Sequence, residues 1–224
     1  MRVILQVLVG SHAHGLETEE SDRDYFQIFQ TPTQHLLKIM PEHFQKGDKL
    51  KTFEGDVTSH EMGRFLYLAC KSNPTIIEVF RAPIIAQTPV GEEMLNLFPF
   101  IWSRKGVRNA FMGYSLDQHK RFLTAIGTSD HRRFNKAAAT RLRMLYNGTE
   151  LLTTGDFTIR IADTPMGETV RRFKLGQFDR AEYDELSEAW GVKLQEAYEN
   201  SPDKHTDFDA INKFLLKSRK EFWE

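Results

Sequence analysis

The N-terminal part of the chain alternates short apolar segments with polar ones, a pattern typical of strands joined by loops. Residues 3–9 are apolar and β-branched over a short run, which favours a buried strand. A second strand is predicted at residues 22–29, after the polar loop 17–21, because aromatic and β-branched residues gather there. A third strand is predicted at 51–57, followed by apolar residues at helical spacing over 62–70.

The second half of the chain repeats apolar residues mainly at helical spacing. The predicted helices cover residues 101–126, 131–147, 179–200 and 207–223. The segment 83–99 contains proline and glycine and is predicted to lead out of the sheet. We therefore expect an α+β protein with a small sheet domain at 1–98 and a mainly helical domain at 99–224.

Gly10 and Ser11 come directly after the first predicted strand. Glycine lets the backbone approach a ligand closely, and a short helix at about 12–16 would present free N–H groups. The Ser11 hydroxyl adds a further donor. This turn is therefore a candidate binding site for the phosphates of a nucleotide.

Asp22 and Asp24 alternate along the second predicted strand, so their side chains should share one face. Their Cα atoms would be roughly 6.5 to 7 Å apart, close enough for the two carboxylates to share divalent ions. Hard oxygen ligands favour Mg²⁺ or Mn²⁺ over zinc. The spacing therefore predicts a metal site beside the Gly10 turn.

A third carboxylate is expected from a neighbouring strand, and Asp56 is the best candidate. Glu54 lies on the same face of the predicted strand 51–57 and is its rival. The strand is predicted to stop at a capping box in which Thr58 and Glu61 satisfy the first N–H groups of the next helix. Glu61 is therefore interpreted as a capping residue.

Two further sets of charged residues leave alternatives open. Glu78 stands on an apolar segment and either orients a catalytic group or pairs with a buried arginine. Lys136 and Arg143 are seven residues apart and so lie on one side of the predicted helix 131–147. From spacing alone this is a solvated basic face or a contact for phosphate groups.

Gly10-Ser11, Asp22-x-Asp24 and Asp56 together resemble the DNA polymerase β-like nucleotidyltransferase superfamily. Within it, the chain is similar to predicted nucleotidyltransferases of bacteria and their phages. The similarity continues through residues 56–62, 73–78, 136–148 and 150–155. The resemblance implies a small mixed β-sheet that carries the carboxylates, helices packed on it, and a mainly helical C-terminal part.

The same resemblance implies an activity. A nucleoside monophosphate would be transferred from a nucleoside triphosphate to a hydroxyl group by a two-metal mechanism, with RNA or tRNA, a protein or a small molecule as acceptor. Asp22 and Asp24 would hold both ions, and Asp56 would bind the second. Gly10, Ser11, Lys136 and Arg143 would bind phosphate groups of the nucleotide or acceptor, since relatives carry a lysine and an arginine before the glycine at position 148.

Composition is compatible with this interpretation. The net charge of -1 and the pI near 6.7 give no general attraction to nucleic acid, so any RNA contact must rest on a local patch. The single Cys70 cannot form an internal disulfide, which suits the cytoplasm. No segment reaches the roughly 20 apolar residues of a membrane span, so no membrane contact is expected.

Two other functions remain open at this point. His12 and His14 form a His-x-His motif after the first strand, as in many metal-dependent phosphohydrolases, although the chain lacks the repeated strand and helix of such barrels. A catalytically silent nucleotide-binding protein on the same fold is the second alternative. Loss of one of the three aspartates would indicate it, and all three are present.

Overall fold

The computed structural model describes residues 1–38, 48–52, 55–126 and 130–224, and it confirms the α+β class. The contacts among these residues divide the chain into two compact units. Unit 1 consists of Met1–Ala13, Glu17–Ser103 and His205–Glu224. Unit 2 consists of His14–Leu16 and Arg104–Lys204.

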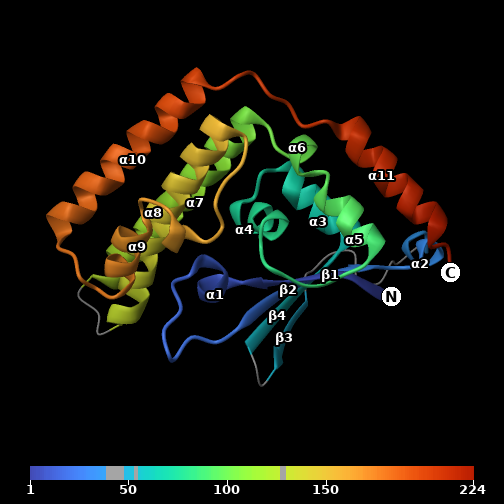
Figure 1. Cartoon of the computed structure of the whole chain (residues 1–224), viewed down its shortest axis with the longest axis horizontal. Coiled ribbons are helices and arrows are strands. Elements are labelled where there is room, and N and C mark those ends of the chain that lie inside the picture. The colour runs from blue at the N-terminus through green and yellow to red at the C-terminus, as the bar shows by residue number, and fades with distance from the viewer. Residues whose placement is uncertain (39–47, 53–54, 127–129) are drawn as a thin grey trace. The chain divides into compact units, whose positions relative to one another are not determined.

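Unit 1 is built on a five-stranded mixed sheet with the order β3-β4-β2-β1-β5 (Figure 1). The strands are β1 (Arg2–Val9), β2 (Asp24–Gln30), β3 (Asp48–Thr52), β4 (Gly55–Glu61) and β5 (Ile84–Gln87). β1 pairs antiparallel with β2 and with β5. β2 pairs parallel with β4, and β3 pairs antiparallel with β4. The small mixed sheet that the resemblance implied is thus present.

The helices of unit 1 are mostly short. They are α1 (Gly10–His14), α2 (Thr33–Leu36), α3 (Met62–Cys70), α4 (Pro74–Ile77), η1 (Glu78–Phe80), α5 (Pro89–Leu95), α6 (Phe98–Ile101) and α11 (Phe208–Glu221). The last residue of α1, His14, is assigned to unit 2. In Figure 1, α3 and α5 lie over one face of the sheet, with α11 alongside α5.

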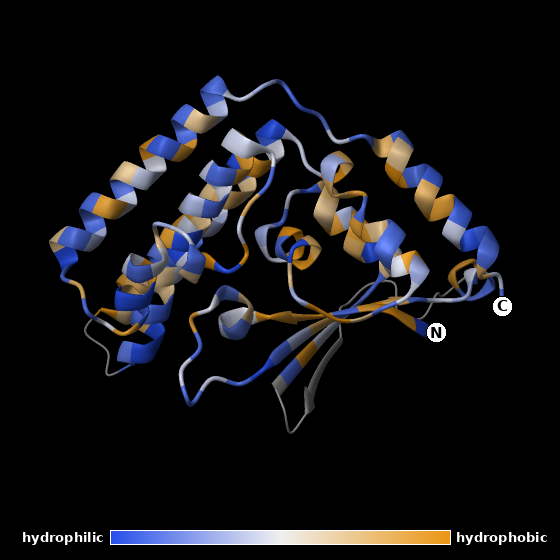
Figure 2. Cartoon of the chain, in the orientation of Figure 1, coloured by the Kyte–Doolittle hydropathy of each residue, from blue (hydrophilic) through white to orange (hydrophobic). Residues whose placement is uncertain are grey.

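Apolar side chains of the sheet and of α3 form the core of unit 1. β1 is orange along most of its length in Figure 2, and Ile4, Leu5 and Val7 are buried. A series of aromatic rings continues the core, with centroids 6.1 Å apart for Phe26 and Phe65 and 5.3 Å apart for Phe65 and Phe80. The helix predicted at 62–70 is confirmed because its buried residues recur at helical spacing.

At Gly91, the backbone of helix α5 packs directly against the backbone of β1, with no side chain between them. A Cβ atom built on Gly91 would be 2.1 Å from the carbonyl oxygen of Ile4, which is far below a van der Waals contact. Thr88 caps this helix, because its hydroxyl accepts a hydrogen bond from the Gly91 N–H. The close approach fixes the position of α5 on the sheet.

Two predictions for this unit are wrong in detail. Residues 83–99 are more than a connection, since they form β5 and α5. Residues 58–61 are not a capping box, since they continue β4 as far as Glu61, with Val57, Ser59 and Glu61 buried on alternate positions. The predicted single strand 51–57 is thus divided between the end of β3, at 51–52, and the start of β4, at 55–57, and Glu54 lies outside the described residues.

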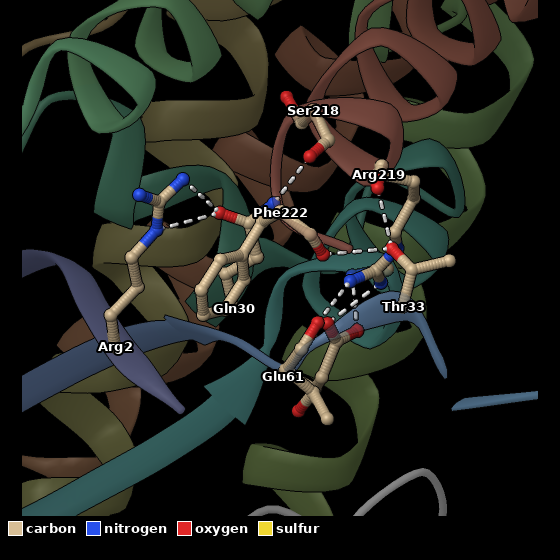
Figure 3. Close-up of polar contacts among 9 residues, drawn as sticks. Arg2, Gln30, Thr33, Glu61, Ser218, Arg219 and Phe222 are labelled. Carbon is tan, nitrogen blue, oxygen red and sulfur yellow. Dashed lines mark hydrogen bonds and ion pairs between the residues drawn. The ribbon is translucent and has the colours of Figure 1, made fainter. Parts of the chain in front are cut away.

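The C-terminal helix α11 belongs to unit 1, although the sequence assigned all of 99–224 to the second domain. Buried side chains and hydrogen bonds to backbone carbonyl groups attach this helix to the rest of unit 1 (Figure 3). The Gln30 side-chain amide donates to the Ser218 carbonyl at 2.7 Å, and the Thr33 hydroxyl lies 2.6 Å from the carbonyl oxygen of Arg219. Arg219 Nη2 lies 2.7 Å from Glu61 Oε1.

Unit 2 is helical and is organised around one central helix. Its elements are α7 (Arg104–Ala125), α8 (His131–Thr154), η2 (Ile161–Asp163), α9 (Gly167–Lys174) and α10 (Arg180–Asn200). α8 contacts α7, α9 and α10, which explains why most of its later residues are buried. It begins with the Asp130 cap and ends at Gly155 in the left-handed conformation with φ 82°.

The predicted helices of this part are confirmed, with α8 one turn or more longer than expected. Residues 157–161, from the segment after α8 to the first residue of η2, form no strand. None of the helices that the structure describes has both the length and the apolar character needed to cross a membrane.

Candidate active site

The Gly10 turn and the Asp24 carboxylate lie against each other in unit 1. Val9 pairs with Asp24 across the antiparallel strands, so the residue after Val9 is placed beside the start of β2. Gly10 has φ 69°, a left-handed conformation that glycine adopts without strain. A Cβ atom at this position would be 2.7 Å from Asp24 Oδ2. The carboxylate thus occupies the space that the missing side chain leaves.

Asp56 lies beside Asp24 on the neighbouring strand. Tyr25 pairs with Val57 in the parallel β2–β4 pair, and Asp24 and Asp56 each stand one residue before these partners. Neighbouring strands are about 4.8 Å apart, and residues in register project to the same face. Phe26 and His60, which lie diagonally across the same two strands, confirm that these positions share a face, because their ring centroids are 5.2 Å apart. Both aspartates are half-buried.

Asp22 is placed differently from its prediction. β2 begins at Asp24, so Asp22 lies in the preceding loop and is exposed. The argument from strand periodicity therefore does not apply to it. Within the described ranges, no three His, Cys, Asp or Glu side chains are arranged to hold a metal ion. The structure thus brings Gly10, Asp24 and Asp56 together, and places Asp22 two residues before the strand.

His12, which the sequence offered only as part of a His-x-His metal motif, contacts the backbone of this loop. His12 Nε2 lies 3.0 Å from the carbonyl oxygen of Ser21, and since a carbonyl only accepts, Nε2 carries the hydrogen. The loop is also closed on itself, because Thr18 N–H donates to the Ser21 hydroxyl at 2.9 Å and Ser21 N–H donates to the Thr18 carbonyl at 2.9 Å. His12 therefore ties the helix after Gly10 to the residue before Asp22.

The rival carboxylates are committed elsewhere or lie far along the chain. Glu61 is fully buried, caps α3 through the Gly63 N–H, and pairs with Arg219. It stands five residues after Asp56 on β4, which corresponds to about 16 Å along a strand. Glu78 is buried in η1. Compared with Glu61 and Glu78, Asp56 therefore remains the better candidate, and its rival Glu54 lies outside the described residues.

The pKa of His60, on the same face of the sheet as Asp24 and Asp56, lies below its ordinary value. Burial of the ring lowers this pKa most, and the positive charge of Arg64 lowers it further. The neutral ring is consequently the form that the folded protein favours next to Phe26.

The basic residues predicted for phosphate binding belong to unit 2. Lys136 is exposed near the start of α8, whereas Arg143 is buried further along the helix. The two residues therefore do not form a uniformly solvated basic face. Lys174 donates a hydrogen bond to the carbonyl of Leu16, and Arg171 donates to the carbonyl of Gly15 at 2.8 Å. Within unit 2, α9 thus holds the backbone of the segment that follows α1.

The comparison with protein families identifies the family of the chain. A sequence profile described as RlaP, the RNA repair pathway DNA polymerase beta family, matches residues 1–217, almost the whole chain. The chain belongs to this family. Membership in the RlaP family confirms the resemblance to polymerase β-like proteins and indicates a nucleotidyltransferase.

Two further comparisons add little to the RlaP assignment. A solved structure of a nucleotidyltransferase-like protein from Exiguobacterium sibiricum 255-15 aligns with 98% of this chain and 74% of that chain, at 9% identity and a TM-score of 0.33. A likeness at that level carries no argument about the site. Curated protein sequences gave no match.

Proposed function

We propose that this member of the RlaP family transfers a nucleoside monophosphate from a nucleoside triphosphate to a hydroxyl group of RNA. The observation that carries the proposal is the contact between the Gly10 turn and the Asp24 carboxylate, with Asp56 in register on the next strand. A glycine turn that leaves room for a phosphate, next to two carboxylates that can bind divalent cations, suits nucleotidyl transfer. The family description names an RNA repair pathway, which supports the choice of RNA as the proposed acceptor.

The chain's own residues would act by position and charge. Gly10 leaves room for a phosphate to approach the backbone, and Ser11 offers a hydroxyl donor. His12 holds the loop that carries Asp22 and so limits where that carboxylate moves. Lys136 and Arg143 are proposed to contact phosphate groups of the nucleotide or the acceptor. Such fixed groups account for much of the rate in phosphoryl transfer.

The donor set suits a hard divalent cation, since Asp24 and Asp56 present carboxylate oxygens on one face of the sheet. Asp24 and Asp56, with Asp22 moving in from its loop, would hold Mg²⁺ or Mn²⁺. When bound, such ions would neutralise phosphate charge and lower the pKa of the acceptor hydroxyl.

The test is transfer of label from each α-labelled nucleoside triphosphate to RNA in the presence of Mg²⁺ or Mn²⁺. We expect label in the RNA fraction, and its loss on addition of a chelator. Asp24→Asn and Asp56→Asn should abolish transfer while the variants stay folded. Glu20→Gln, which removes an exposed carboxylate from the same loop region, is the matched control and should transfer normally.

Other outcomes would contradict the proposal. Label in the protein fraction would show that the acceptor is a protein and not RNA. Release of phosphate without transfer would indicate a phosphohydrolase. Nucleotide binding with no label in any fraction would indicate a silent binding protein. If Asp24→Asn transferred label at the wild-type rate, Asp24 would not be a catalytic residue.

A further inference from the structure

Four exposed cationic side chains gather where α7 ends and α8 begins in unit 2. Arg121 belongs to the last turns of α7, and Arg132, Arg133 and Lys136 belong to the first two turns of α8. The two helices pack against each other and are joined by a short connection, so these ends adjoin. Figure 2 shows the first turns of α8 mainly in hydrophilic blue. We refer to these residues as the α7–α8 basic cluster.

The acidic residues nearest in sequence already have other partners. Asp117 lies 3.5 Å from the Lys120 ammonium. The Asp130 carboxylate caps α8 by accepting from the Arg133 N–H at 3.0 Å. Among the residues that the structure describes, the four cluster side chains have no ion-pair partner.

The acids that follow the α9–α10 connection, at the start of α10, are committed as well. This connection adjoins α8, because a Cβ atom on Gly176 would be 2.5 Å from the Asn135 side chain. Glu182 pairs with Arg172 at 2.5 Å, and Asp184 pairs with Arg180 at 2.6 Å. The neighbouring carboxylates therefore do not neutralise the cluster.

The Asp130 carboxylate at the N-cap of α8 offsets one of the three cluster charges on this helix and leaves the other two without compensation from it. The N-terminal end of a helix carries a partial positive charge, which favours acidic residues in the first turn. α8 has no acidic residue in its first turn and has cations there instead. An arrangement that opposes a local rule is expected where a function uses it. A bound anion would remove the conflict, because it interacts favourably with the cations and with the helix end.

We propose that the α7–α8 basic cluster binds the phosphate backbone of single-stranded RNA. This inference rests on the proposed function, since it assigns Lys136 to the acceptor and not to the nucleotide. Arg132 and Lys136 are one turn apart, with Cβ atoms about 6 Å from each other. Arg121 lies on a second helix, about 8 to 10 Å away from axis to axis. Such a spread matches successive phosphates of a strand better than one compact triphosphate.

Arginine also suits this ligand, because the planar guanidinium donates two parallel hydrogen bonds to a phosphate. The chain as a whole is close to neutral, with a net charge of -1, so RNA binding must come from a local concentration of charge. The cluster supplies such a concentration within unit 2.

The experiment measures binding of a short fluorescein-labelled single-stranded RNA by anisotropy over a series of salt concentrations, without nucleotide. The test variant is Arg132→Gln/Arg133→Gln/Lys136→Gln. Each lost phosphate contact should reduce the slope of log K against log salt by about 0.7, so the triple variant should lose about 2. Circular dichroism confirms that α8 still forms, since glutamine is a good helix former.

The control removes the same charge from elsewhere. Its three exposed lysines are Lys105, at the opposite end of α7, and Lys213 and Lys220 on α11, each changed to Gln. This variant should bind RNA with the wild-type slope. An unchanged slope in the test variant, or an equal loss in the control, overturns the proposal. Loss of ATP binding with RNA binding intact also overturns it, because the cations would then serve the triphosphate.

A separate variant distinguishes this inference from the proposed function. Asp24→Asn should bind the RNA as the wild type does and fail to transfer label. If wild-type protein transfers no label to RNA but the triple variant still loses salt-dependent RNA binding, the proposed function fails and the RNA site stands.

Discussion

At the scale of single residues, Gly10 is required for two different reasons. Its φ of 69° is unfavourable for any side chain, and a Cβ atom would meet Asp24 Oδ2. Gly155 separates these reasons, because it has φ 82° but nothing within 4 Å of an added Cβ atom.

Both Gly10→Ala and Gly155→Ala should lower the free energy of unfolding by about 1 to 2 kcal/mol, the cost of the left-handed conformation. Only Gly10→Ala should also move the Asp24 carboxylate and reduce kcat/KM for nucleotidyl transfer, by about 100-fold for a displacement near 1 Å. Denaturant unfolding and steady-state kinetics measure the two effects. Equal activity of the two variants would show that the clash with Asp24 is harmless.

A pH-dependent stability is expected from His60. Its pKa in the folded protein lies below the ordinary value of 6.5, so the unfolded chain binds more protons as the pH falls below 6.5. The stability that the neutral ring contributes is therefore complete above pH 6.5 and is lost progressively below it. In His60→Phe, which keeps a ring beside Phe26, the free energy of unfolding should fall less steeply with acid.

The comparison is the difference in unfolding free energy between wild type and variant at each pH. His119, whose pKa burial also lowers, remains in both proteins and does not affect the difference. Parallel curves for the two proteins would mean that His60 does not carry the effect.

Single residues also mark the limit of helical spacing as a guide. Lys136 and Arg143 point in similar directions from α8, as their spacing predicts. Their exposure differs because other elements cover the middle of the helix and leave its start open. The spacing of residues along a helix gives the direction of each side chain, whereas its burial depends on which other elements pack against that part of the helix.

At the scale of elements, the attachment of α11 offers two ion pairs on one helix for comparison. Arg219 is 13% exposed and its partner Glu61 is 0% exposed, whereas Lys217 and Glu93 are 53% and 44% exposed. Arg219→Ala leaves the buried Glu61 carboxylate without its charge partner and should cost about 3 to 5 kcal/mol of unfolding free energy.

Lys217→Ala should change the stability little, because water screens an exposed pair. Chemical denaturation of both variants gives the two values. Similar losses would indicate that α11 is held by its helix packing and not by the buried pair.

The elements that the sequence predicts well are those whose evidence is local. β1 follows from a short run of apolar, β-branched residues, and α3 follows from apolar residues at helical spacing, both within a few residues of sequence. The end of β4 is not local. Thr58 and Glu61 fit a capping box as well as a strand, and the partner that buries Glu61 is Arg219, near the other end of the chain. β5 was missed because its side chains are exposed and show no buried pattern.

At the scale of the whole molecule, the two units should respond separately to a local change. Arg219 contacts residues of unit 1, so Arg219→Ala should increase hydrogen exchange in β2, β4 and α11. The amides in the middle of α8 should exchange at the wild-type rate, since α8 lies in unit 2. Mass spectrometry of peptides from both units tests this. A uniform increase throughout the chain would show that the units unfold together.

The order of elements along the chain, sheet first and helices later, could be predicted from the pattern of apolar residues. The sequence could not predict that α11 belongs to unit 1 and residues 14–16 to unit 2. These assignments depend on contacts between distant residues, such as those from Arg171 to Gly15 and from Gln30 to Ser218. The candidate site shows the same division. The proximity of Gly10, Asp24 and Asp56 could be predicted from their places on or next to strands, whereas the contact of His12 with the Ser21 carbonyl could not, because no side-chain pattern reveals it.

The close packing of α5 on β1 limits which residues can replace Gly91 during evolution. Since the Ile4 carbonyl fills the place of a side chain at position 91, the distance between the helix and the strand is set by two stretches of main chain. Evolution cannot adjust that distance by enlarging or trimming a side chain at this position. A relative with alanine or serine there must have relocated the helix, which makes this one position a marker of altered architecture among distant homologues.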